Sequence, residues 1–310
     1  MTTSISSAES TSLASKETAA IDLPRAAPPH GLLAHTIASR FLFLHICVSL
    51  VLSALAYGTV HYWSLAVFAA GGVLAIFLWI ADGWRLATLR ISKNVLQLPL
   101  LGLVALGLFQ LLPLRNANSS RVLTAAAVKT LSLDPFSTRL VIVQLTTLLV
   151  FFAATLVFVD TPHRLRIIVR TITIFGFLLA IFGMTQSFTS PTKIYWVRDL
   201  TQSTAFGPFI NRHHFAGYME LALAIPLGLL FSGAIEGEKK LLYIFAVGMM
   251  GIALILTNSR GGIISLAAEF LFLVVIEGFR RKHHHHETEA KQSRVRSSIV
   301  RAALALALVR

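Results

Sequence analysis

A short polar stretch between two apolar runs holds the residue types best suited to chemistry. Phe206–Glu220 reads FGPFINRHHFAGYME, with Asn211 and Arg212 just before the apolar run that starts at Phe215. Asparagine is a favoured helix N-cap, and the first turn of a helix presents unpaired N–H groups that attract anions. An arginine adds a planar fork of donors that matches a phosphate group. The stretch predicts an anion site at a helix N-terminus; the alternative is an arginine that merely snorkels to a membrane surface.

Two further features should shape the entry to this helix. Gly207 and Pro208 form a dipeptide that is typical of a turn. The aromatic residues Phe206, Phe209 and Phe215 are expected to seat the entry at a membrane interface, where aromatic side chains are enriched.

A second arginine repeats the pattern further along the chain. In the stretch LTNSRGGIIS, Asn258 or Ser259 can cap the helix that follows Arg260, and Gly261 lets a ligand approach the backbone closely. A plain tight turn would use the same residues, so this stretch alone is ambiguous. Together with Arg212, however, it predicts one anionic ligand shared by two arginines. A lipid-linked diphosphate fits, with its tail between the helices and its headgroup at the interface.

The neighbouring ionisable residues offer fewer clear roles. His213 or His214 could serve as a general base near neutral pH, although a structural hydrogen bond is the commoner use of such a histidine. Glu220 could pair with Arg212, and Glu269 lies in the middle of an apolar run, where a charge is a candidate for function. The sequence shows no set of residues with zinc-ligand spacing, and we expect neither a metal nor a cofactor.

The composition defines the elements that must position these residues. The 310 residues are 55% hydrophobic and only 13% charged, with a mean hydropathy of +0.73. An ordinary soluble domain has about a quarter of its residues charged. Because apolar stretches of about 18 or more residues recur, the sequence predicts an all-α, polytopic transmembrane helix bundle. The formal net charge of +13 is explained by basic loops at a membrane rather than by nucleic-acid binding.

The apolar runs predict about nine spans. The expected segments are Phe41–Tyr57, Trp63–Ala81, Val95–Leu112, Leu140–Val159, Ile167–Phe188, Phe215–Ala234, Leu241–Thr257, Ile263–Glu277 and a ninth from Ile299 to Arg310.

The distribution of basic residues predicts the orientation. With the N-terminus inside, and counting from Arg25 onwards, 15 basic residues fall on inner segments and 8 on outer loops. This bias favours a cytoplasmic N-terminus and places both arginine motifs on the outer face.

The same order of spans predicts the domain organisation. Residues 1–38, rich in Ser, Thr and Ala, are expected to form a disordered cytoplasmic tail ahead of a transmembrane domain over 39–310. Outer loops are expected near 113–139, with a short surface helix within Asn116–Ser137, and near 189–214. A basic, histidine-rich inner loop is expected near 279–298, where four consecutive histidines indicate a polar linker rather than a metal site.

Several familiar catalytic and transport signatures are missing from the sequence. It contains no GxxxxGK[ST] loop, no GxGxxG after a strand, no nucleophile elbow and no HExxH. A transporter or lipid flippase, the rival hypothesis, would need polar groups through the bilayer midplane. Charge in the middle of the spans is nearly limited to Glu269, so the sequence favours a site on one membrane face.

Three stretches carry a resemblance to a known family. KIYWVRDL (Lys193–Leu200), FGPFINRHHFAGYMEL (Phe206–Leu221) and LTNSRGG (Leu256–Gly262) resemble the bacterial O-antigen ligase and polymerase family. The segment TPHRLRIIVRTI is also similar to it. The resemblance covers Thr161–Glu277, and the earlier spans resemble the family only in hydropathy.

The resemblance implies a function and a location. Members of the family are polytopic proteins of the bacterial inner membrane. They transfer a glycan from an undecaprenyl-diphosphate carrier to lipid A-core or to another carrier-linked glycan on the periplasmic face, without a metal. Periplasmic arginines hold the carrier's diphosphate, and Arg212 and Arg260 match such arginines. Asn211, Ser259, Gly261 and Glu220 would support this site.

The chain also departs from the family pattern. The family has more spans and a large later periplasmic loop, whose histidine is proposed as the base that activates the acceptor. We expect this chain to be an N-terminal portion or a truncated product, because it stops at Arg310 inside an apolar run. His213 and His214 belong to a different motif and are only weak candidates for that base. The alternatives that stay open are an inactive or carrier-lipid-binding fragment and a transporter or flippase.

Overall fold

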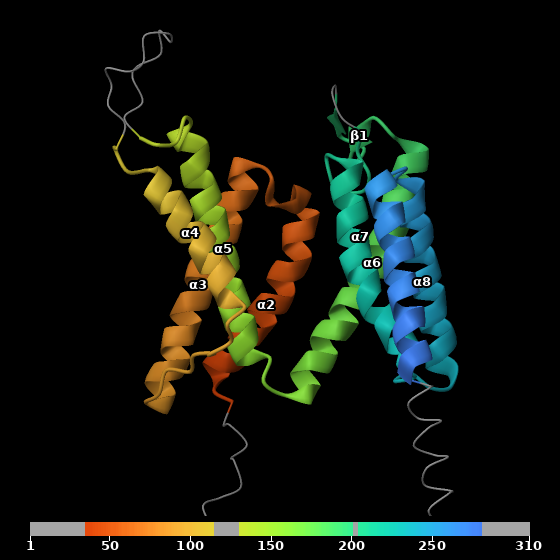
Figure 1. Cartoon of the computed structure of the whole chain (residues 1–310), viewed down its shortest axis with the longest axis horizontal. Helices are drawn as coiled ribbons and strands as arrows, with labels where there is room; N and C mark the ends of the chain where they lie inside the picture. The colour runs from red at the N-terminus through yellow and green to blue at the C-terminus, as the bar shows by residue number, and fades with distance from the viewer. Residues whose placement is uncertain (1–34, 115–129, 201–203, 281–310) are drawn as a thin grey trace, which may run out of the picture. The chain divides into compact units, whose positions relative to one another are not determined.

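The chain forms a series of helices with one small hairpin. The computed structural model describes residues 35–114, 130–200 and 204–280. Its elements all belong to one unit that starts at Ile37. They are α2 (Ile37–Leu55), the 3-10 turn η1 (Tyr57–Thr59), α3 (Tyr62–Leu86), α4 (Gln97–Gln110), α5 (Pro135–Phe158), α6 (Pro162–Thr189), β1 (Lys193–Ile194), β2 (Arg198–Asp199), α7 (Arg212–Phe231), α8 (Glu238–Leu256) and a last helix, Arg260–Arg280 (Figure 1).

Most of these helices can cross a membrane. Seven of those in the described ranges are long and apolar enough, which confirms an all-α membrane protein with transmembrane helices. The expected span Val95–Leu112 differs, because α4 has only 14 residues. At about 1.5 Å per residue α4 measures roughly 21 Å, short of the ~30 Å hydrocarbon core of a bilayer.

Some expectations fall on residues that the structure does not describe. The ninth span, Ile299–Arg310, is among them, so a count of nine spans stays a prediction. The same holds for residues 1–34 of the expected tail, for 115–129 of the expected surface helix and for 281–298 of the histidine-rich loop. Pro135–Ser137, expected to belong to the outer loop near 113–139, instead opens α5.

Two helices start earlier than hydropathy indicates, because polar caps define their first turns. Asp134 accepts hydrogen bonds from the backbone N–H groups of Phe136 and Ser137, both at 3.1 Å, and α5 begins at Pro135 instead of Leu140. Thr161 accepts from the backbone of Arg164 at 3.2 Å, and α6 begins at Pro162 instead of Ile167. Proline is favoured in a first turn, since its missing N–H would have no partner there.

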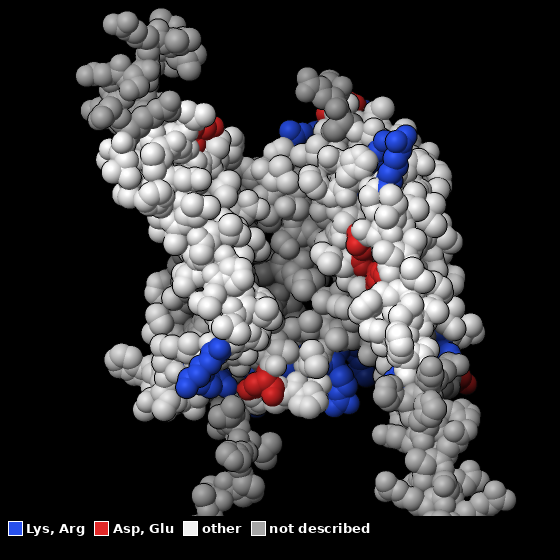
Figure 2. Space-filling model, viewed as in Figure 1, with Lys and Arg blue, Asp and Glu red and all other residues white. Residues whose placement is uncertain are grey.

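The outer faces of the helices suit a lipid environment. Leucine, isoleucine, valine and phenylalanine side chains are exposed along the spans, as with Leu221 on α7, which is 75% exposed. Figure 2 shows Lys, Arg, Asp and Glu mostly at the two ends of the helices, with one acidic patch midway along the otherwise white face. Apolar side chains can stay exposed at this density because hydrocarbon replaces water around them.

The helices pack around two clusters of buried apolar residues. The larger lies mainly among α6, α7 and α8 and includes Leu179, Met219 and Met250, together with Ala54 of α2. The smaller lies among α2, α3 and α5, around Leu42 and Phe158, both fully buried. The last helix adds Leu266 and Leu273 to the larger cluster. α6 to α8 and the last helix therefore form the framework that carries both arginine motifs.

A polar network ties the starts of α2 and α6 together. The Arg164 guanidinium donates to Ser39 Oγ of α2 at 2.9 Å and to the Phe158 carbonyl at 2.8 Å, and lies 3.5 Å from Asp160. Arg90 pairs with the buried Asp82 at 2.8 Å. Removing one partner of such a buried pair would leave an uncompensated charge.

Candidate functional site

The start of α7 has the turn and the cap that its sequence predicts. Phe206 and Phe209 exchange backbone hydrogen bonds of 3.2 Å across Gly207–Pro208. Gly207 has φ +58, a left-handed value that glycine tolerates without strain. The Asn211 side chain then accepts from the backbone N–H of His213 at 2.9 Å. Arg212 is thus the first helical residue, three residues earlier than the hydropathy indicates.

The phenylalanines of this stretch lie in the core and not at an interface. Phe206 is 3% exposed, Phe209 7% and Phe215 fully buried. The Phe206 and Phe215 rings have centroids 4.5 Å apart. The Phe215 ring also fills the space over Gly183 of α6, where a Cβ atom would lie 2.8 Å from it. These rings pack the start of α7 against α6. The expectation that they lie at a membrane interface is therefore corrected.

The start of the last helix is capped by Ser259. Ser259 Oγ accepts from the backbone N–H of Gly262 at 3.3 Å, and the Ser259 carbonyl accepts from Ile263 at 3.0 Å. The preceding residue, Asn258, adopts a left-handed conformation with φ +53. The sequence left the cap open between Asn258 and Ser259, and the geometry assigns it to Ser259. Arg260 is therefore the first residue of its helix, as Arg212 is of α7.

A direct hydrogen bond joins the two motifs. His213 Nδ1 lies 3.0 Å from Ser259 Oγ, although the residues are 46 positions apart. One turn further on, the helices approach so closely that a Cβ atom on Gly262 would lie 3.0 Å from the Cβ of Ala216. The two helix N-termini thus open side by side, and their positive dipole ends add together at this end of the bundle.

The arginines at these N-termini are available to a ligand. The Arg212 side chain is half-buried and Arg260 is exposed. Among the residues that the structure describes, neither guanidinium makes an ion pair or a side-chain hydrogen bond. Gly261 is exposed, with open space beside its Cα. Two arginines in the first turns of adjacent helices, neither paired with another described residue, form a site whose electrostatics favour a multiply charged anion.

Glu220 has a different neighbour from the one expected. It lies eight residues beyond Arg212 on α7, roughly 12 Å along the axis at about 1.5 Å per residue, and no ion pair joins the two within the described chain. Instead Glu220 acts electrostatically on Glu269 of the last helix. The Glu269 Oε2 atom is buried with no hydrogen-bond partner among the described residues.

The histidines differ in how firmly they are held. The His213 ring is fixed through Nδ1 by Ser259, whereas the exposed His214 ring makes no described side-chain hydrogen bond. No three His, Cys, Asp or Glu side chains of the described ranges gather as metal ligands.

A basic and aromatic cluster near the hairpin was missed by the sequence reasoning. Arg198 on β2 lies 2.9 Å from His61 Nε2, with its guanidinium 6.0 Å from the centre of the Tyr57 ring. The Tyr195 hydroxyl donates to the Leu55 carbonyl, which ties the hairpin to the end of α2. Burial raises the pKa of the Tyr195 hydroxyl to about 12, and Tyr57 adds to the shift. The alternation of aromatic and charged residues in KIYWVRDL was the available signal.

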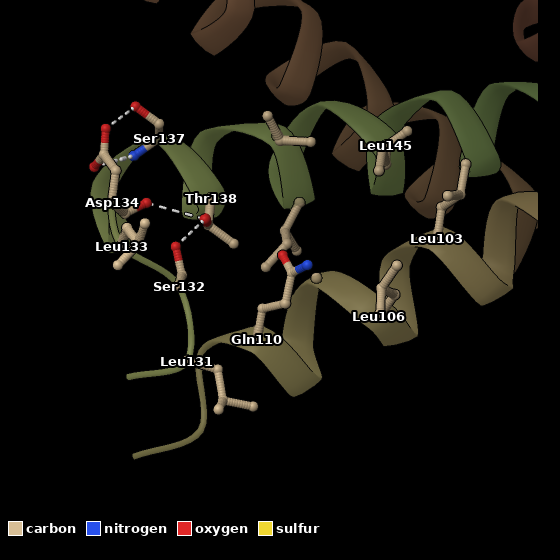
Figure 3. Close-up of a pocket in the computed structure, with 13 residues that line it drawn as sticks. Leu103, Leu106, Gln110, Leu131, Ser132, Leu133, Asp134, Ser137, Thr138 and Leu145 are labelled. Carbon is tan, nitrogen blue, oxygen red and sulfur yellow. Dashed lines mark hydrogen bonds between the residues drawn. The ribbon is translucent and has the colours of Figure 1, made fainter. Parts of the chain in front are cut away.

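A cavity of about 700 Å³ lies between α4 and α5. Figure 3 shows its leucine walls, including Leu103, Leu106 and Leu145, and a polar end with Ser132 and Thr138. None of the described residues that line it is a lysine or an arginine. Its chemistry therefore suits an apolar chain and not a diphosphate.

Comparison with known proteins gave no matching family model, no matching curated protein and no matching solved structure.

Proposed function

We propose that this protein is a membrane-embedded glycan transferase of the O-antigen ligase and polymerase type. It binds an undecaprenyl-diphosphate-linked glycan and passes the glycan to an acceptor, either lipid A-core or another glycan. The single observation that supports this most is the pair of arginines Arg212 and Arg260, which have no side-chain partner among the described residues. Each lies in the first turn of a capped helix, and the His213–Ser259 bond joins the two helices. On this proposal the site faces the periplasm of a bacterial inner membrane.

The proposed reaction is a displacement at the anomeric carbon of the carrier-linked sugar. An acceptor hydroxyl oxygen forms the new C–O bond while the bond from that carbon to the diphosphate oxygen breaks. The hydroxyl proton passes to a base, and the leaving carrier diphosphate gains negative charge. Arg212, Arg260 and the two helix N-termini stabilise that charge, which is the kind of preorganised electrostatic effect that lowers such barriers most.

His213 is the better-placed of the two adjacent histidines to act on that proton. If Nδ1 donates its hydrogen to Ser259 Oγ, the Nε2 lone pair is free to accept a proton. Ser259 would then be a positioning residue that selects the tautomer. His214 has no such partner in the described structure.

The test uses the full chain reconstituted with an undecaprenyl-diphosphate-linked glycan and each acceptor in turn. We expect glycosylated acceptor from the parent protein. Arg212→Ala and Arg260→Ala should abolish transfer and weaken carrier binding at least tenfold while leaving membrane insertion intact. Arg139→Ala is the matched control, because Arg139 is an exposed arginine of α5 outside the site. Normal transfer by both site variants would overturn the proposal, and carrier binding without transfer by the parent would reduce it to a carrier-binding role.

Glu220 and Glu269 favour a second candidate, a transporter or flippase. Two interacting carboxyl groups within the spans are the kind of feature that proton-coupled transport uses. Carrier-lipid movement across proteoliposomes that is lost in Glu269→Gln, with transfer absent in the parent, would support this candidate.

A further inference from the structure

A second open groove lies between α6 and α8, far from the arginine site. Its volume is about 410 Å³. Its walls are apolar: Phe177 of α6 and Phe245 of α8 have ring centroids 5.7 Å apart, and Ile174 lines the same groove. Lys239 lies in the first turn of α8, whereas the arginine site adjoins the opposite end of that helix.

Two cations stand at this groove. Arg170 of α6 and Lys239 of α8 both line it, together with the half-buried Tyr243. In the described part of the chain, neither cation forms an ion pair, and no acidic residue lines the groove. Glu238, next to Lys239 in sequence, is not part of its lining.

The position of Arg170 makes an anionic partner valuable. Arg170 lies eight residues after the start of α6, roughly 12 Å along the helix axis at about 1.5 Å per residue. Arg170 also falls inside the apolar run Ile167–Phe188, and a guanidinium within a spanning segment is costly unless it snorkels or meets an anion. A phosphate group between Arg170 and Lys239 would satisfy both charges, and the Tyr243 hydroxyl offers a further donor.

We infer that this groove binds an anionic phospholipid, with its phosphodiester between Arg170 and Lys239 and an acyl chain along Phe177 and Phe245. The apolar walls favour a lipid over a free phosphate ion, which would gain nothing from them. The two positive charges favour an anionic over a zwitterionic headgroup, since basic pockets between spanning helices recognise anionic lipids. The inference is independent of the proposed glycan transfer, because it uses different residues at the other end of the helices.

The first test measures lipid selectivity and its dependence on charge. The purified full chain in detergent is titrated with phosphatidylglycerol or phosphatidylcholine, and bound lipid is counted by native mass spectrometry. We expect phosphatidylglycerol to be preferred, and Arg170→Gln combined with Lys239→Gln to weaken its binding about tenfold or more. The control combines Arg166→Gln with Lys240→Gln, which removes the same charge from exposed neighbours that do not line the groove. Equal losses in the two double variants would overturn the inference.

The second test locates the bound lipid. Leu242 lines the groove and its neighbour Leu241 does not, although both are exposed, at 64% and 73%. In bilayers with a low fraction of brominated phosphatidylglycerol, Leu242→Trp should be quenched more strongly than Leu241→Trp. The excess should disappear when the Arg170→Gln and Lys239→Gln changes are added. Equal quenching of the two tryptophan variants would mean that no lipid is held in the groove.

Discussion

His213 Nδ1 and Ser259 Oγ lie 3.0 Å apart and join the first turns of two spanning helices that are distant in sequence. The same serine oxygen caps the last helix through the backbone N–H of Gly262. Ser259 is 4% exposed, so its hydroxyl has little access to water as a replacement partner. One small side chain therefore caps the last helix and links it to the first turn of α7.

Replacing Ser259 by alanine should destabilise the protein by about 1–2 kcal/mol, because the variant loses a helix N-cap and leaves His213 without its partner. The measurement is thermal unfolding in a mild detergent. Ser232→Ala is the control, since the Ser232 hydroxyl bonds only to a carbonyl of its own helix at the exposed far end of α7. If the two variants unfold at the same temperature, the His213–Ser259 hydrogen bond makes no contribution of its own to the free energy of unfolding.

The close approach of α7 and the last helix predicts opposite outcomes at two adjacent glycines. A Cβ atom on Gly262 would lie 3.0 Å from the Cβ of Ala216, an atom fixed to the α7 backbone, so Gly262→Ala must push the helices apart. Gly261→Ala meets nothing within 4 Å. We expect Gly262→Ala to cost about 1–3 kcal/mol of stability, typical of overpacking. Gly261→Ala should be neutral or slightly stabilising, because alanine favours helix.

Thermal unfolding of the two glycine variants, measured side by side, checks this expectation. Carrier binding should be weaker in Gly262→Ala than in Gly261→Ala, because separating the helices would also separate Arg212 from Arg260. Equal stability of the two variants would contradict the close packing of these helices.

Local signals in the sequence were enough to predict the helix starts at the site. The Gly207–Pro208 turn and the Asn211 cap depend on residues within a few positions of each other, and both are confirmed. The alternation of spans placed Arg212 and Arg260 at the same end of the bundle. Each capped helix starts before its apolar run, because the first turn is polar and hydropathy does not register it.

The long-range relationships could not be predicted from the sequence. Nothing near His213 indicates that its partner is Ser259, because that contact depends on how α7 packs on the last helix. Phe206 and Phe215 were expected at an interface, since hydropathy cannot tell a lipid-facing ring from one buried between helices. The groove between α6 and α8 had one signal in the sequence, the charge of Arg170 inside an expected span. Its second cation, Lys239, lies on another helix, so the sequence did not show that the two residues come together.

The hydrogen bond from the Tyr195 hydroxyl to the Leu55 carbonyl predicts a stability difference that depends on pH. Tyr195→Phe removes the hydrogen bond to the Leu55 carbonyl and should lower stability by about 1 kcal/mol at pH 8. Because the folded-state pKa is raised from 10.0 to about 12, the hydroxyl contributes fully below pH 10. That contribution is lost as pH rises from about 10 to about 12, so the difference between parent and variant should shrink over this range.

Unfolding midpoints of the parent and Tyr195→Phe across that pH range provide the measurement. Tyr62→Phe serves as the control, because Tyr62 is 68% exposed and makes no described hydrogen bond. A stability difference that stays constant up to pH 12 would rule out the hydroxyl as its source.

A double-mutant cycle tests whether Arg212 and Arg260 hold one ligand. If both guanidinium groups contact the same diphosphate, removing either should weaken carrier binding by about 1.5–3 kcal/mol, the range for a hydrogen bond to a charged group. The double variant should lose less than the sum of the single losses, since a diphosphate that has lost one clamp is held less well by the other. Binding is measured with the isolated carrier lipid, so the result does not depend on turnover. Strictly additive losses would mean that the two arginines act on the carrier independently, and a loss in only one of the two variants would mean that the other arginine does not contact the carrier. Arg139→Ala again provides the baseline for losing one exposed charge.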